Sequence, residues 1–178
     1  MSSLEEPGHR WRVLLVDTAT HWGNGLAARL QGIGRGAVRV ESVDGARFAD
    51  ALDGGQFDLA LLAGEALDDL ARVMPDLDLA ALALRVPVLL VLGTGHDLGA
   101  TGDATAQLGA VVWRRDFSDD EFFAAAAQAR LNHAFQRNPD GLVLLDADRR
   151  AVVSNPAARR MLAQEPLIWE PGTVHGYH

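Results

Sequence analysis

The sequence contains neither cysteine nor lysine. Without cysteine the chain can form no disulfide bond and no thiolate metal site, and it has no cysteine nucleophile. All sixteen basic residues are arginines. The absence of lysine excludes Schiff-base chemistry and the lysine of a phosphate-binding loop.

Basic charge and long apolar runs are also scarce. The 178 residues include 24 acidic and 16 basic side chains, which gives a net charge of −8. Such a chain has no broad cationic surface to displace counterions from a nucleic acid, so we expect no nucleic-acid partner. The apolar stretch near the N-terminus, residues 13–16, is far too short for a signal-peptide core or a membrane span. We therefore expect a cytoplasmic protein with no membrane partner.

What the chain does have is a globular composition, with 48% hydrophobic residues, and five short apolar segments that read as strands. These segments are residues 11–17, 37–43, 57–63, 87–92 and 109–113. Helical patterns lie between them, and this alternation predicts an α/β fold with a doubly wound, five-stranded parallel sheet. Any binding site is expected at the carboxyl ends of the strands.

The C-terminal third begins with a long helix and then changes character. Ser118 and Glu121 match a capping box that would open a helix running to about residue 135. After a turn-rich stretch, residues 142–146 and 151–154 predict a hairpin. Asn155 is a suitable N-cap for a helix that follows, with proline at its first position.

Residues 10–134 resemble the receiver domain of two-component response regulators. The resemblance rests on Val-Leu-Leu-Val-Asp ending at Asp17, Phe-Asp-Leu-Ala-Leu-Leu at 57–62, Pro-Val-Leu-Leu-Val-Leu at 87–92 and Gly-Ala at 109–110. It implies the flavodoxin-like strand order 2-1-3-4-5.

Receivers of this family hold Mg²⁺ and accept a phosphoryl group through a few fixed positions. These are two adjacent acids after strand one, an aspartate ending strand three, a hydroxyl residue after strand four and a lysine after strand five. The corresponding positions here are Asp17, Thr18, Ala63, Thr94 and Arg115. The resemblance therefore implies a degenerate phosphorylation site.

Alanine at position 63 cannot form an aspartyl phosphate, because a methyl group carries no nucleophilic oxygen. Mg²⁺ also requires several oxygen ligands, so we expect no metal, no cofactor and no catalytic residue. Two alternatives stay open. Glu65 could serve as an atypical phosphate acceptor, or the strand ends could bind a small ligand or a nucleotide.

Residues 135–178 resemble the N-terminal part of a PAS domain. The resemblance is carried by Pro-Asp-Gly at 139–141, Asp-Ala-Asp at 146–148 and Asn-Pro-Ala-Ala at 155–158. It implies two strands and the first helix of that domain, while the strands that would complete its sheet are missing. We expect an incomplete PAS domain after the receiver-like domain.

Four aromatic residues are candidates for an interface: Trp113, Phe117, Phe122 and Phe123. The resemblance places Trp113 at a strand position that, in receivers, responds to phosphorylation beside a docking face. Adjacent residues of one helix cannot both face the same core. We therefore expect either Phe122 or Phe123 to be exposed or to lie at an interface.

Together these features predict a non-catalytic pseudo-receiver and PAS regulatory module of a bacterial signalling protein. Its expected partners are a second copy of itself and other signalling proteins or domains. The resemblance further implies an output such as a cyclic-di-GMP turnover domain or a histidine kinase.

Overall fold

A computed structural model describes residues 10–17, 23–64, 71–92, 110–114 and 117–164. By its internal contacts the chain divides into two compact units, residues 1–136 and residues 137–178. Each unit is described separately below. No helix in the described part of the chain is both long enough and apolar enough to cross a membrane.

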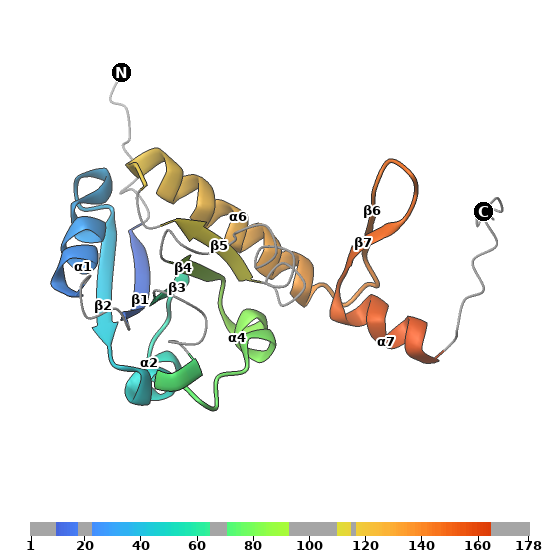
Figure 1. Cartoon of the computed structure of the whole chain (residues 1–178), viewed down its shortest axis with the longest axis horizontal. Coiled ribbons are helices and arrows are strands. Elements are labelled where there is room, and N and C mark those ends of the chain that lie inside the picture. The colour runs from blue at the N-terminus through green and yellow to red at the C-terminus, as the bar shows by residue number, and fades with distance from the viewer. Residues whose placement is uncertain (1–9, 18–22, 65–70, 93–109, 115–116, 165–178) are drawn as a thin grey trace, which may run out of the picture. The chain divides into compact units, whose positions relative to one another are not determined.

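The first unit is built on a five-stranded parallel sheet (Figure 1). Its strands are β1 (Trp11–Asp17), β2 (Val38–Val43), β3 (Leu59–Gly64), β4 (Val88–Leu92) and β5 (Ala110–Arg114). Their spatial order is β2-β1-β3-β4-β5, and all four pairings are parallel. The predicted doubly wound α/β fold and its strand order are confirmed.

Helices lie between these strands or follow the last of them. They are α1 (Gly23–Gly32), η1 (Ile33–Arg35), η2 (Gly45–Arg47), α2 (Phe48–Gly54), α4 (Leu79–Arg85) and α6 (Asp119–Arg137). A chain reversal between α1 and β2 uses Gly34 and Gly36, whose φ angles of 55° and 89° are positive. Glycine is favoured at such positions because it has no Cβ to clash.

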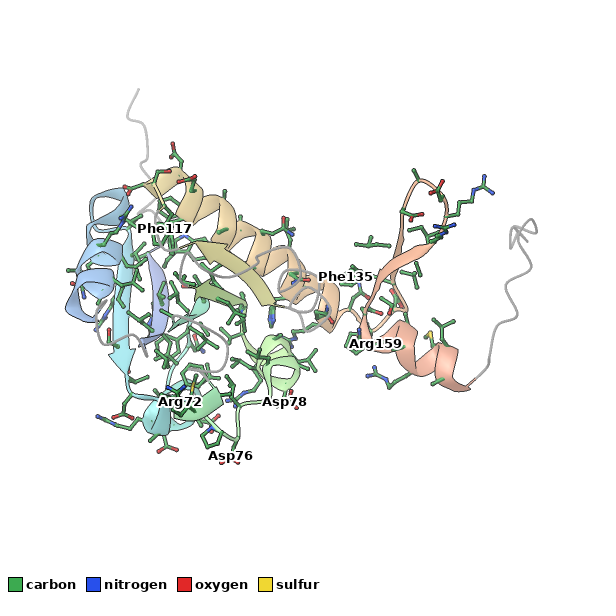
Figure 2. The ribbon with its side chains drawn as sticks, in the orientation of Figure 1. Arg72, Asp76, Asp78, Phe117, Phe135 and Arg159 are labelled. Carbon is green, nitrogen blue, oxygen red and sulfur yellow. The ribbon has the colours of Figure 1, made fainter. Side chains whose placement is uncertain are left out.

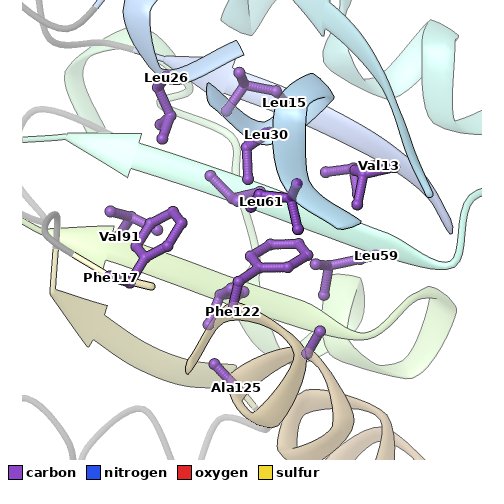
Figure 3. Close-up of a cluster of buried hydrophobic side chains, with 14 of the residues drawn as sticks. Val13, Leu15, Leu26, Leu30, Leu59, Leu61, Val91, Phe117, Phe122 and Ala125 are labelled. Carbon is purple, nitrogen blue, oxygen red and sulfur yellow. The ribbon is translucent and has the colours of Figure 1, made fainter. Parts of the chain in front are cut away.

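Side chains alternate between the two faces of the sheet and build a core on each. On one face, Leu26 and Leu30 of α1 and Phe122 of α6 meet the odd-numbered residues of β1 and β3 (Figure 3). On the other face, α2 and α4 cover the even-numbered residues of the same strands. Strands buried on both faces explain why the sequence shows continuous apolar runs rather than alternation.

The described residues of the second unit form a hairpin followed by a helix, as the sequence predicts. Strand β6 (Val143–Leu145) pairs antiparallel with β7 (Ala151–Ser154), and α7 (Pro156–Gln164) follows. The Asn155 side chain accepts a hydrogen bond from the Ala158 N–H at 2.8 Å. Asn155 is therefore the N-cap that the sequence indicates.

The capping box at the start of α6 is also confirmed. The Ser118 N–H donates to the Glu121 carboxylate at 2.7 Å, and the Glu121 N–H donates to the Ser118 hydroxyl at 3.3 Å. The Ser118 backbone and side-chain hydrogen bonds, helped by the positive charge of Arg29, lower the pKa of Glu121 from its ordinary value. Each bond favours the ionised carboxylate.

A lowered pKa makes the stability of this helix start depend on pH. The contribution of Glu121 is complete above its unfolded pKa and is lost as the pH falls through the lower folded value. As the pH falls from about 6 to about 3, the Tm of the wild type should therefore decrease by more than the Tm of Glu121→Gln does. Thermal melts of both proteins across this range test the prediction, and parallel curves would contradict it.

Candidate functional site

The candidate site lies where the central strands end. Asp17, the last residue of β1, is in register with Ala63 of β3, and Ala63 is in register with Val91 of β4. Neighbouring parallel strands lie about 4.8 Å apart. Ala63, which the resemblance equates with the acceptor position, is therefore adjacent to Asp17 in the sheet.

Ala63 is fully buried, with 0% of its surface exposed, and its methyl group belongs to the core on the α1 and α6 face. The whole of β3 is buried in the same way, from Leu59 to Gly64, and none of its residues has a polar side chain. At this position β3 offers packing atoms where a nucleophilic oxygen would be needed. The Ala63 methyl group therefore contributes to the core.

The other predicted positions of this site lie outside the described residues. These are Thr18, Thr94, Arg115 and the alternative acceptor Glu65. For Asp17 the structure gives the backbone position in β1 but not the side chain. Within the described ranges, no group of three histidine, aspartate or glutamate side chains is arranged to hold a metal ion.

Two of the four aromatic interface candidates, Phe117 and Phe122, lie in the core. Phe117 and Phe122 are 3% and 0% exposed, and their ring centroids lie 5.9 Å apart. Figure 2 labels Phe117 beside the start of α6. The guanidinium of Arg29 lies 5.0 Å from the Phe117 ring centroid and also donates to the Phe117 carbonyl. Neither ring is available to a partner in this structure.

Phe123 is the less buried member of the adjacent pair, as the helix geometry requires. Its ring is half-buried and lies 6.4 Å from that of Trp11 and 5.6 Å from that of Phe122. Trp113 belongs to β5, but its side chain is outside the description. Phe123 and Trp113 therefore remain as interface candidates.

The sequence reading missed a groove between α2 and the segment that leads into α4. A cavity of about 520 Å³ lies there, and its lining includes the apolar side chains of Phe48, Leu52, Met74 and Leu82. The groove lies beside α2 and α4, each of which has seven residues. Helical periodicity reports which side of a helix is apolar, but it does not report how far apart two helices lie.

A scan against models of protein families and a search of curated proteins found no match to this chain. Among solved structures, a response regulator receiver protein from Burkholderia phymatum is 22% identical, with a TM-score of 0.46 over 67% of this chain and 94% of that one. Full-length FixJ from B. japonicum is 23% identical, with a TM-score of 0.49 over 69% of this chain and 59% of FixJ.

The signal receiver domain of an HD domain-containing protein from Pseudomonas fluorescens Pf-5 is 18% identical, with a TM-score of 0.46 over 75% of this chain and 96% of that one. The structural neighbours thus include receiver domains. At these low identities the likeness concerns the fold alone. The assignment to the doubly wound α/β class rests on the strand order and the register of the sheet itself.

Proposed function

We propose that this chain is a non-catalytic regulatory module of a bacterial cytoplasmic signalling protein, in which a pseudo-receiver precedes the N-terminal part of a PAS domain. It acts by homodimerisation and by contacts with other signalling domains, without aspartate phosphorylation. Its output is a cyclic-di-GMP turnover domain or a histidine kinase. One observation carries the proposal: the buried methyl group of Ala63 lies in register with Asp17 at the carboxyl edge of a receiver-like sheet.

Phosphoryl transfer to a protein requires a nucleophilic oxygen and a counter-charge for the phosphate. Ala63 has no such oxygen, and the chain has no lysine. Arg115, which stands at the lysine position of the resembled family, keeps the positive charge but not the ammonium group. A module with this composition can still transmit a signal by changing how its helices pack against a partner.

The second unit supports the PAS part of the proposal. Its hairpin, N-cap and helix follow the order that the resemblance implies. All three residues of β6 are exposed, with Leu144 at 54% and Leu145 at 50%. A two-stranded sheet with apolar residues on both faces is marginal by itself, so it needs a further surface to cover it.

The direct test is the intact mass of the whole chain after incubation with acetyl phosphate or beryllofluoride and Mg²⁺, with light scattering on the same samples. We expect no covalent adduct and the molar mass of a dimer before and after treatment. The matched comparison is Ala63→Asp, which places a carboxylate at the position of the receiver nucleophile. Its intact mass is measured after the same incubation.

A stoichiometric adduct on the wild type would overturn the proposal, and peptide mapping would show whether Glu65 carries it. If a member of a nucleotide panel raised the Tm, that result would instead favour the alternative hypothesis, in which the strand ends bind a small ligand or a nucleotide. A monomer in light scattering would remove homodimerisation from the proposal while leaving the absence of phosphorylation in place.

A further inference from the structure

The second unit holds most of the large apolar side chains that the described residues expose. There are eight of these, and five belong to this smaller unit: Val143, Leu144, Leu145, Met161 and Leu162. Single exposed apolar side chains are ordinary on a protein surface. A group of them on a short stretch of chain indicates a surface that another segment covers.

The apolar side of α7 is covered at its start and open at its end. Ala157 and Ala158 are each 3% exposed, and an added Cβ on Gly141, at the base of the hairpin, would come within 3.3 Å of the Ala158 Cα. Met161 and Leu162 follow four residues later on the same side of the helix. Their side chains are nevertheless 55% and 37% exposed. The last turn of this apolar side therefore has no cover among the described residues.

The sequence that follows α7 has the composition of such a cover. The helix ends at Gln164, and residues 165–171, which lie outside the described part of the chain, read Glu-Pro-Leu-Ile-Trp-Glu-Pro. Proline lacks a backbone N–H and disfavours helical geometry at the residue before it, so Pro166 predicts that the chain leaves the helix here. Three consecutive apolar residues, 167–169, begin five residues after Leu162.

The charges of the two segments are complementary. Helix α7 contains Arg159 and Arg160 and no acidic residue, whereas residues 165–171 contain Glu165 and Glu170 and no basic residue. Both arginines are exposed. Because exposed ion pairs add little to stability, these charges favour one orientation of the segment rather than hold it in place.

We propose that residues 166–170 fold back over Met161 and Leu162 of the same chain and cover the open end of the apolar side of α7. Apolar contacts between a residue just beyond a helix C-terminus and the last helical turn are common, and Leu167 has the spacing for one.

Tethering favours this segment over the same segment of a second copy. A segment joined by a few residues has an effective concentration in the millimolar range, so at about 10 µM protein it is favoured about a hundredfold. The covered surface is then closed to other partners, and any partner of α7 must first displace residues 166–170. The inference does not depend on the proposed function, because it concerns only contacts within the second unit.

The test measures hydrogen exchange of the full chain, resolved to the last turn of α7. Trp169→Ser removes the largest apolar side chain of the proposed cover and should lower the protection of residues 160–164 about fivefold. Tyr177→Ser, which also replaces an aromatic residue with serine but lies outside residues 166–170, should keep the protection of the wild type. Leu162→Ser should lower the protection as well, and adding Trp169→Ser to it should have little further effect, because the contact is already lost.

Protein concentration distinguishes the tethered segment from a second copy. We expect equal protection of residues 160–164 at low and at high concentration. The proposal is overturned if Trp169→Ser keeps the protection of the wild type, or if its full effect persists in the Leu162→Ser background. Protection that rises with protein concentration would also overturn it and would assign the contact to a second copy. If Leu162→Ser also removes the protection of the hairpin, Met161→Ser takes its place in the same comparison.

Discussion

Replacing Phe122 with alanine is expected to lower the free energy of unfolding of the first unit by about 3–5 kcal/mol. The Phe122 ring is 0% exposed and packs between α1, α6 and the strands of the sheet (Figure 3). Its removal loses the transfer free energy of the ring and leaves a cavity that the rigid sheet cannot close. Urea unfolding followed by far-ultraviolet circular dichroism measures the loss.

Phe123→Ala is the matched control, because it removes the same ring from the next position of the same helix. The Phe123 ring is only half-buried, and its contacts include the ring of Trp11. Its loss should cost about 1–2 kcal/mol, since less apolar surface returns to water. Equal destabilisation of the two variants would contradict the difference in burial between Phe122 and Phe123.

This pair of phenylalanines shows which features of side-chain burial can be predicted from the sequence. Helix geometry is sufficient to predict that Phe122 and Phe123 face different surroundings. It does not say which of the two meets the core, because that depends on where α6 crosses the sheet. The same limit explains why the burial of Phe117 was not predicted. Phe117 precedes the helix and lies in the core beside Arg29.

The strand order was predictable because alternating strands and helices leave few topologies once crossovers are right-handed. The register that places Asp17 beside Ala63 follows from that order and from the apolar runs. The groove between α2 and the segment that leads into α4 was not predicted, because it depends on the distance between two elements and not on the apolar side of either one.

Removing the side chain of Asn155 should open the second unit while leaving the first unit folded. The Asn155 side chain is fully buried and makes four hydrogen bonds that tie the turn, the hairpin and α7 together. Its oxygen accepts from the N–H groups of Leu142 and Ala158, at 3.0 and 2.8 Å. Its amide nitrogen donates to the carbonyls of Asn138 and Asp140, at 3.1 and 2.8 Å.

In Asn155→Ala these backbone groups lose their partner, at a cost of about 1–3 kcal/mol for each one that stays buried. A hairpin and one helix have little stability in reserve, so hydrogen-exchange protection across residues 138–164 should be lost. Asn138→Ala is the control, because it removes only an exposed bond from the Asp140 N–H at 2.9 Å and should keep the protection. Protection that survived in Asn155→Ala would mean that the hairpin and the helix are held by contacts other than this cap. Loss confined to the second unit would show that the two units unfold separately, as their division by internal contacts implies.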